Sequence, residues 1–325
     1  MNIAIIGTGA YGIALSLMFH KNNNKIQMWT KFEEEKDRIL NERENKKVLP
    51  GVKIPDDIDI TCDMEEVVKD KDLIVIAVPA GFVDDVSFEI GKYFTEEQTF
   101  LLASKGIERN SCLFVGDIFK RHVKTRKYAV ISGPSFAVDM VTNCPIGLTL
   151  ASEHKKTRKL VRGALESDSI KIRESRDVIG VEICGSIKNV IAIAAGILDG
   201  MGYPESTQAM FIVESLHDIK ELISKLGGDR KTILTYAGFG DLLLTATSKK
   251  SRNFSYGRLL GTKAPKSEVE TYVNTTTIEG LYTIQSIYKL LKNKRVKIPI
   301  INLIYDIIEG KKDVNSLPEF LINKK

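Results

Sequence analysis

The first half of the chain alternates short apolar runs with stretches of helical periodicity. Strands are expected at the apolar runs, which are Asn2–Ile6, Lys25–Trp29, Asp72–Val78, Thr99–Ser104, Tyr128–Ser132 and Ile146–Ala151. The stretches between them, such as Val83–Tyr93 and Ser111–Val123, have the spacing of helices. Strands that are apolar on both faces and alternate with helices are typical of a parallel sheet covered on both sides. The pattern therefore predicts an α/β, doubly wound N-terminal domain.

Strand-like runs disappear beyond about Ser175, and helical periodicity takes over. Helices are expected over Val178–Leu198, Glu205–Leu226, Lys231–Leu234, Ser255–Gly261, Glu279–Lys292 and Ile300–Glu309. Glycines and a proline separate these segments, as is usual at helix ends, and Asp177 is a candidate cap for the first helix. The sequence therefore predicts two domains, an α/β domain over residues 1–176 and an all-α domain over residues 177–325.

A glycine-rich turn follows the first expected strand. Gly7, Gly9 and Gly12 fill the pattern G-x-G-x-x-G in the segment GTGAYG, directly before an expected helix over Ile13–Phe19. The first glycine of this pattern allows a tight turn, the second lets a pyrophosphate approach the backbone, and the third packs helix against strand. The helix N-terminus then offers N–H groups to phosphate. Strand, glycine turn and helix in this order predict a Rossmann-type dinucleotide-binding domain.

The residues after the second expected strand bear on which dinucleotide binds. NAD-selective sites usually carry an aspartate or glutamate here, which accepts hydrogen bonds from the ribose hydroxyls. This chain has Thr30 and Lys31 instead, and its acidic residues begin only at Glu33. Because no carboxylate is expected to repel a 2′-phosphate and Lys31 could pair with one, the sequence modestly favours NADPH over NADH. The alternative is that Lys31 is a solvated loop residue.

Composition narrows the class of protein. A hydrophobic fraction of 43% and a charged fraction of 27% are ordinary for a soluble globular protein, and the net charge of +5 is spread along the chain, unlike a nucleic-acid-binding patch. The four cysteines have neither close nor CxxC spacing, so no zinc site or disulfide framework is indicated (Cys62, Cys112, Cys144 and Cys184). The first residues lack the features of a signal peptide, and the later apolar run Val190–Leu198 is too short to span a bilayer. We therefore expect a cytoplasmic protein without a metal, a nucleic-acid partner or a membrane insertion.

Lys188 and Asn189 interrupt an apolar segment of small residues, Val181–Gly196. On a helix, Lys188 shares its face with small neighbours, which are Cys184, Gly185, Ala192 and Ala195. Burying a lysine is costly unless something compensates, and small neighbours would leave room for a ligand beside its ammonium group. The alternative is a lysine at the edge of a buried helix that extends its head group to water.

A nicotinamide cofactor would require an acid or base for the substrate hydroxyl. The four histidines lie in helical or polar stretches away from the expected strand ends, so we interpret them as structural or surface residues. The candidates are then Lys188 and Lys105, which directly follows a strand. If both face one crevice, each lowers the pKa of the other, as a lysine base requires. Asp241, in the segment AGFGD, is either a helix cap or a partner that orients Lys188.

The segment Ser251-Arg252-Asn253 is a polar cluster just before an expected helix. An arginine fork fits phosphate oxygens, and a helix start adds N–H donors. Together with Gly133 and Ser135, which lie in a loop after another strand, this cluster is a candidate pocket for a small phosphorylated substrate. The alternative is an ordinary surface loop.

Taken in order, these residues resemble the NAD(P)-dependent glycerol-3-phosphate dehydrogenases, especially the bacterial type. The matching stretches are GTGAYGIALS, ASKGIE, ISGPSFA, VEICGSIKNVIAIAAGILDG, YAGFGDLLLT, SKKSRNFSYG and IEG. The resemblance implies that the protein reduces dihydroxyacetone phosphate to sn-glycerol 3-phosphate for glycerophospholipid synthesis, as a homodimer. It also implies that Lys188 is the proton acceptor.

The resemblance further implies which residues bind the ligands. The substrate would be held by Lys105, Gly133, Ser135, Lys188, Asn189, Asp241, Ser251, Arg252 and Asn253. Besides the three glycines, the cofactor would contact Ala10, Tyr11, Lys31, Lys105, Ala137, Arg252 and Glu279. Two departures from the family pattern concern the cofactor. Position 31 is often histidine or arginine, and Thr275-Thr276-Thr277 is less apolar than usual, which leaves a contact of Thr277 open.

Two alternatives to this function are considered. A 3-hydroxyacid dehydrogenase of the related two-domain type also uses a helix lysine, but its substrate carries a carboxylate and would not need the Ser251-Arg252-Asn253 cluster. A catalytically silent sensor would bind the dinucleotide and report through a partner, and such a protein could lose Lys188 or Asp241 without penalty. Both residues are present here.

Overall fold

Two compact units make up the chain in this computed structural model, which describes residues 1–324. The first unit contains Met1–Lys105 and Val115–Val178, and the second contains Gly106–Phe114 and the chain from Ile179 onward. The short segment Gly106–Phe114 is closed by a bridge between Ile107 and Phe114, and both side chains belong to the hydrophobic core of the second unit.

The first unit is built on an eight-stranded sheet. Its strands are β1 (Asn2–Ile6), β2 (Lys25–Trp29), β3 (Asp59–Thr61), β4 (Leu73–Ile76), β5 (Thr99–Leu102), β6 (Tyr128–Ser132), β7 (Ile146–Ala151) and β8 (Ile170–Ser175). They lie in the order β3-β2-β1-β4-β5-β6-β7-β8, and β1 to β6 are parallel. The strand order reverses between β1 and β4, which is where ligands bind in sheets of this type. The predicted α/β Rossmann-type fold is confirmed.

The far edge of the sheet differs from the expected parallel arrangement. Strand β7 runs antiparallel to β6, with Val130 opposite Ala151 and Ser132 opposite Thr149. Between these strands lies only the four-residue helix α6 (Ala137–Met140), which is too short to carry the chain back along the sheet for a parallel crossover. The chain therefore turns back as a neighbouring antiparallel strand, and β8 pairs parallel to β7.

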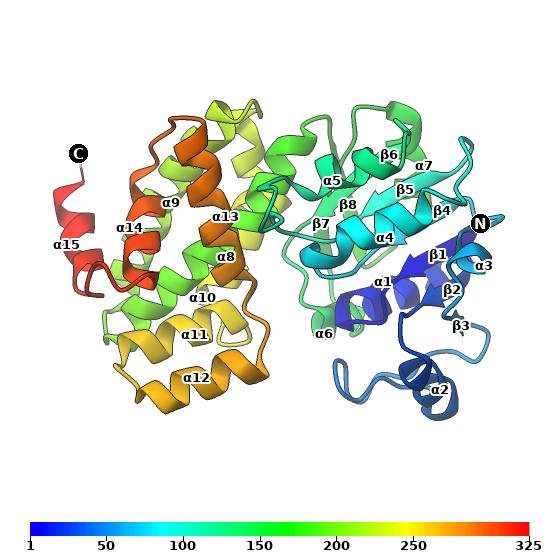
Figure 1. Ribbon diagram of the computed structural model, residues 1–325, viewed down its shortest axis with the longest axis horizontal. Coiled ribbons are helices and arrows are strands. Elements are labelled where there is room, and N and C mark those ends of the chain that lie inside the picture. Colours follow the sequence, from blue (N-terminus) through cyan, green and yellow to red (C-terminus); the bar gives the residue numbers. More distant parts are fainter. Residues whose placement is uncertain (325) are drawn as a thin grey trace. The chain divides into compact units, whose positions relative to one another are not determined.

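Seven α-helices and one 3-10 turn surround this sheet. They are α1 (Ala10–Lys21), α2 (Glu33–Glu42), α3 (Met64–Val68), η1 (Ala80–Phe82), α4 (Val83–Ile90), α5 (Val115–His122), α6 and α7 (Lys155–Leu165). Helix α1 packs with α6 and α7, whereas α4 packs with α3 and α5, so the two groups form separate layers (Figure 1). The strands between them are almost wholly buried, which explains their continuous apolar runs.

The second unit is helical. Its elements are α8 (Val178–Gly200), α9 (Glu205–Lys225), η2 (Arg230–Leu234), η3 (Tyr236–Gly240), α10 (Asp241–Thr247), α11 (Arg252–Gly261), α12 (Lys266–Thr275), α13 (Glu279–Asn293), α14 (Pro299–Ile308) and α15 (Ser316–Asn323). Helix α8 has 23 residues, so the apolar run noted in the sequence belongs to an element that is long and apolar enough to cross a membrane. However, 78% of the most apolar 18-residue stretch of α8 is buried inside the protein. Burial in the helical core therefore accounts for its composition.

Glycines bring α8 and α11 unusually close together (Figure 1 shows the two helices). A Cβ atom on Gly196 would lie 2.0 Å from the carbonyl oxygen of Phe254, and one on Gly257 would lie 1.9 Å from the carbonyl oxygen of Ile193. One turn further on, a Cβ on Gly261 would lie 2.1 Å from the carbonyl oxygen of Ile197. No side chain fits at these positions, so the backbones themselves are in contact. This contact runs along α11 from Phe254 to Gly261 and fixes that helix against the C-terminal part of α8.

Candidate active site

The glycine loop has the geometry of a phosphate cradle. Gly7 has φ +120°, a conformation that side chains rarely adopt, and a Cβ on Gly12 would lie 2.2 Å from the carbonyl oxygen of Gly7. A Cβ on Gly9, in contrast, would meet nothing within 4 Å, so open space borders the loop there. Gly9 caps the twelve-residue helix α1 without a side-chain hydrogen bond, and the first turn of α1 holds no acidic residue. These features fit the pyrophosphate of a dinucleotide.

A carboxylate does reach the end of β2, contrary to the argument from sequence. Glu35, in the first turn of α2, accepts hydrogen bonds on Oε2 from the hydroxyls of Thr8 at 2.7 Å and Thr30 at 2.6 Å. Thr8 belongs to the glycine loop and Thr30 directly follows β2. The sequence missed this carboxylate because Glu35 lies six residues beyond the last residue of β2 and comes close to the strand end only in the folded chain. Lys31, which directly follows Thr30 in the chain, is exposed.

Four predicted ligand residues of the first unit lie together at the carboxyl ends of the strands. The ammonium group of Lys105 lies 5.6 Å from the centre of the Tyr11 ring. The hydroxyls of Tyr11 and Ser135 are 3.2 Å apart, and Ser135 donates to the carbonyl of Gly133 at 3.0 Å. The loop that carries Gly133 and Ser135 leads into α6, which begins with Ala137 and packs against α1. The parallel strands thus gather these residues next to the glycine loop.

The main feature of the second unit is an ion pair between Lys188 and Asp241. Lys188 Nζ donates to Asp241 Oδ1 at 2.5 Å. The Lys188 side chain is 12% exposed, whereas that of Asp241 is 1% exposed. A buried carboxylate without its partner would be strongly destabilising, so the ion pair holds the lysine head group beside Asp241. Of the two interpretations of Asp241, the structure shows the partner of Lys188.

A local irregularity in the chain positions Asp241. The turn η3 is a π-helical turn over Tyr236–Gly240, and Asp241 is the first residue of α10 directly after it. Such turns are rare and often occur at functional sites. The hydroxyl of Thr245 donates to the carbonyl oxygen of Asp241 at 2.6 Å and lies 3.4 Å from its Oδ1. Sequence reasoning did not identify Thr245, although its position four residues after Asp241 places it on the same helix face.

Two amides connect the neighbouring helices to the start of α13. Asn189 Nδ2 donates to Glu279 Oε2 at 3.0 Å. Asn253 Oδ1 accepts from the backbone N–H of Gly280 at 2.8 Å. Both asparagines are buried. The structure therefore places Asn189, predicted to bind substrate, in contact with Glu279, predicted to bind cofactor. This contact links α8, which also carries Lys188, to the start of α13.

Ser251 and Arg252 form the start of α11. Ser251 is its N-cap, with its hydroxyl accepting from the backbone N–H of Phe254 at 3.3 Å. Arg252 is the first helical residue and is exposed, and its carbonyl accepts from the Tyr272 hydroxyl at 3.2 Å. The N–H groups of a helix start and a guanidinium group at the same end suit a phosphate. Thr277, for which the sequence does not decide whether it contacts the cofactor, is exposed.

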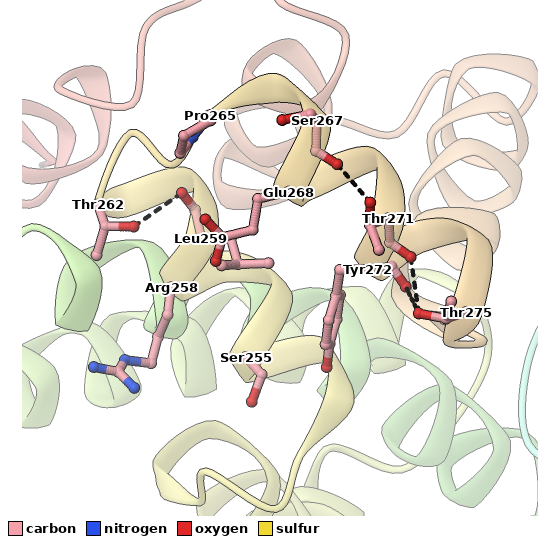
Figure 2. A pocket seen from close by; sticks show the side chains of 10 residues that line it. All are labelled: Ser255, Arg258, Leu259, Thr262, Pro265, Ser267, Glu268, Thr271, Tyr272 and Thr275. Carbon is pink, nitrogen blue, oxygen red and sulfur yellow. Dashed lines mark hydrogen bonds between the residues drawn. The ribbon is translucent and has the colours of Figure 1, made fainter.

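A hollow of about 820 Å³ lies between α11 and α12, and none of the predicted site residues lines it. Figure 2 shows its side chains, and several of its hydroxyls donate back to carbonyl oxygens of their own helices, as Thr271 does to Ser267 at 2.7 Å. The guanidinium of Arg258 is turned away from α12 in this view and pairs with Asp199 at 2.5 Å. The hydroxyls of Thr262, Thr271 and Thr275 in this hollow are thus engaged within the protein.

Two of the four histidines form ion pairs with aspartates away from the predicted site residues. His20 and His122 each pair with an aspartate, Asp57 and Asp84, at 2.9 Å. Among residues 1–324, no group of three or more histidine, cysteine, aspartate or glutamate side chains could hold a metal ion.

The doubly wound sheet with its glycine loop, together with the lysine–aspartate pair of the helical unit, defines a nicotinamide-dinucleotide-dependent oxidoreductase. Residues 2–158 match the family described as NAD-dependent glycerol-3-phosphate dehydrogenase N-terminus, and residues 177–319 match the C-terminus of the same family. The chain belongs to the NAD-dependent glycerol-3-phosphate dehydrogenase family.

Individual relatives agree with this assignment over the full chain. Glycerol-3-phosphate dehydrogenase [NAD(P)+] of Fusobacterium nucleatum is 33% identical over 328 residues, which cover 100% of this chain and 98% of the relative. The enzyme of the same name from Bacillus pumilus is 35% identical over 314 residues, which cover 95% of this chain and 91% of the relative. The crystal structure of glycerol-3-phosphate dehydrogenase from Coxiella burnetii superposes with a TM-score of 0.92 at 28% identity, covering 99% of both chains. The resemblance predicted from the sequence motifs is confirmed.

Proposed function

We propose that the protein interconverts dihydroxyacetone phosphate and sn-glycerol 3-phosphate with NADH or NADPH. The observation that carries the proposal is the ion pair between Lys188 of the buried helix α8 and Asp241 of α10, with Nζ and Oδ1 2.5 Å apart. An ammonium group held by a carboxylate can donate a proton to a ketone oxygen as the carbonyl is reduced. In the opposite direction the lysine accepts the hydroxyl proton. The cofactor supplies or takes up the hydride.

The roles of the other residues are proposed from their chemistry and from the family resemblance. Asp241 orients Lys188, and Lys105 supports the reaction as a second cation. The substrate ligands are proposed to be Lys105, Gly133, Ser135, Lys188, Asn189, Asp241, Ser251, Arg252 and Asn253. The cofactor ligands are proposed to be Gly7, Gly9, Ala10, Tyr11, Gly12, Lys31, Lys105, Ala137, Arg252 and Glu279. We further propose a homodimer that acts in the cytoplasm and supplies glycerol 3-phosphate for phospholipid synthesis.

Arg252→Ala tests whether the start of α11 binds the substrate phosphate. The exposed guanidinium should make charge-assisted hydrogen bonds to a phosphate, so its loss is expected to lower kcat/KM for dihydroxyacetone phosphate about thirtyfold. Steady-state kinetics against substrate concentration measure this effect. Lys250→Ala is the control, because it removes one positive charge two residues away and outside the proposed ligands. An equal loss in both variants would show a general charge effect and would contradict the assignment to Arg252.

Substrate choice separates the proposal from the two alternatives. The purified protein is given a reduced nicotinamide cofactor with dihydroxyacetone phosphate or with a 3-oxo acid. Oxidation by the phosphorylated ketone alone is the expected result. Oxidation by the 3-oxo acid instead would identify a 3-hydroxyacid dehydrogenase, and cofactor binding without turnover of either compound would indicate a sensor.

A further inference from the structure

The adenosine end of the dinucleotide is expected where the glycine loop meets the end of β2. In this chain the two segments are joined by hydrogen bonding, because Gly7 N–H donates to the carbonyl of Trp29 at 2.9 Å. The carboxylate of Glu35 lies at this junction, bound by Thr8 from the loop and Thr30 from the strand end. All of these residues belong to the first unit.

The carboxylate is held at both oxygens. Besides the two threonine hydroxyls on Oε2, Asn45 Nδ2 donates to Oε1 at 3.2 Å and to the carbonyl of Thr8 at 3.1 Å. Asn45 is 1% exposed, whereas the side chain of Glu35 is 24% exposed. A carboxylate offers about four lone-pair positions, so three donors leave one available. Glu35 is therefore fixed in place while part of it remains accessible.

The direction of these hydrogen bonds determines what the junction can bind. A threonine hydroxyl has one hydrogen to donate, and Thr8 and Thr30 both give theirs to Glu35. Towards a ligand these hydroxyls then present lone pairs. A ribose 2′-hydroxyl can donate to such acceptors, whereas a 2′-phosphate dianion is itself an acceptor. The junction is thus matched to a free ribose hydroxyl.

Charge acts in the same direction. Residues 31–38 carry four carboxylates, Glu33, Glu34, Glu35 and Asp37, and three cations, Lys31, Lys36 and Arg38. The guanidinium of Arg38 lies 3.8 Å from Glu35 Oε1. Lys36 is hydrogen-bonded to Glu33, and this bond lowers the pKa of Glu33 and keeps it ionised. A 2′-phosphate adds close to two negative charges beside these carboxylates, and like charges repel.

We propose that Glu35 is the residue by which this protein selects NADH over NADPH. It takes the place of the acidic residue that usually ends the second strand, although it comes from the following helix. This inference rests on the binding of a nicotinamide dinucleotide, and it reverses the preference that the sequence alone suggests. Lys31 then does not set the choice between the two cofactors.

Direct binding tests the proposal without relying on turnover. Dissociation constants for NADH and NADPH are measured by nicotinamide fluorescence for the full chain and for Glu35→Gln. The unmodified protein should bind NADH more tightly, and Glu35→Gln should narrow the ratio of the two constants about tenfold, mainly by tighter NADPH binding. Glu34→Gln is the matched control, because it removes the same charge from the same turn and should leave the ratio nearly unchanged. Glu35→Ala should shift the ratio in the same direction as Glu35→Gln.

The possible outcomes are distinct. Equal weakening of both cofactors in the two Glu35 variants would show a purely structural role and overturn the proposal. Tighter binding of NADPH by the unmodified protein, lost in Lys31→Ala, would assign the selection to Lys31 and also overturn it. If neither cofactor binds to the unmodified protein, dinucleotide binding itself fails, and with it the proposed function.

Discussion

Replacing Lys188 with alanine is expected to lower kcat for dihydroxyacetone phosphate by about 10³-fold or more while cofactor binding persists. The reason is the loss of the only group of the second unit that is proposed to exchange a proton with the substrate oxygen. The glycine loop and Glu35 belong to the first unit and are unchanged by the substitution. Stopped-flow or steady-state oxidation of NADH measures turnover, and fluorescence titration measures binding.

The controls separate catalysis from stability. Lys188→Ala leaves the 1%-exposed carboxylate of Asp241 without its ammonium partner, which costs about 3–5 kcal/mol of folding free energy. Adding Asp241→Asn removes the uncompensated charge, so the double variant should regain stability but remain inactive. Lys324→Ala is a matched control, because this lysine is also 12% exposed and pairs with Asp218 at 2.8 Å. The Lys324→Ala variant should lose stability and keep its kcat. Near-normal turnover in Lys188→Ala would refute the acid/base role of Lys188.

Gly196→Ala is expected to lower the free energy of unfolding by about 3 kcal/mol. The added methyl group would lie 2.0 Å from the carbonyl oxygen of Phe254, and this neighbour is backbone, which cannot rotate away. Helices α8 and α11 would have to separate, which would also displace Arg252 and Asn253 at the start of α11. Thermal or urea denaturation measures the loss, and a fall in kcat/KM should accompany it.

Gly163→Ala is the comparison for this prediction. Gly163 lies within helix α7, and a Cβ there would meet nothing within 4 Å. Alanine has a higher helix propensity than glycine, so the free energy of unfolding of this variant should rise by up to about 1 kcal/mol. If Gly196→Ala proved as stable as the unmodified protein, the close crossing of α8 and α11 would be contradicted.

Strands β1 and β4 to β7 were predictable because each is a largely apolar run, and β2 because apolar residues alternate with Lys25 and Gln27. Strands β3 and β8 were missed because they lie at the two edges of the sheet. β3 has three residues, and β8 alternates buried isoleucines with exposed charges. Helix α12 was missed for a related reason, since it has no buried residue and therefore no apolar stripe. Helices α10 and α15 were also not predicted, although Leu242 and Leu317 belong to the hydrophobic core of the second unit.

At the candidate site, residue types were predictable but their partners were less so. The pairing of Lys188 with Asp241 was one of two open interpretations, because nothing in local sequence shows that residues 53 positions apart are in contact. No carboxylate was expected at the ribose site, because the acidic residues begin only at Glu33, beyond the end of the second strand. Counting residues along the chain from β2 cannot show that a helix folds its first turn back onto the strand end. The spacing of Gly196 and Gly200 was visible in the sequence, but its use as a helix crossing required the facing residues of α11.

The most direct test of the proposed function combines the purified protein with NADH and dihydroxyacetone phosphate. The absorbance of the reduced nicotinamide is followed, and the product is identified by an enzyme specific for sn-glycerol 3-phosphate. Loss of one NADH for each sn-glycerol 3-phosphate formed is the predicted result, with no reaction in the Lys188→Ala/Asp241→Asn variant. Binding of NADH without any oxidation by dihydroxyacetone phosphate would contradict the account.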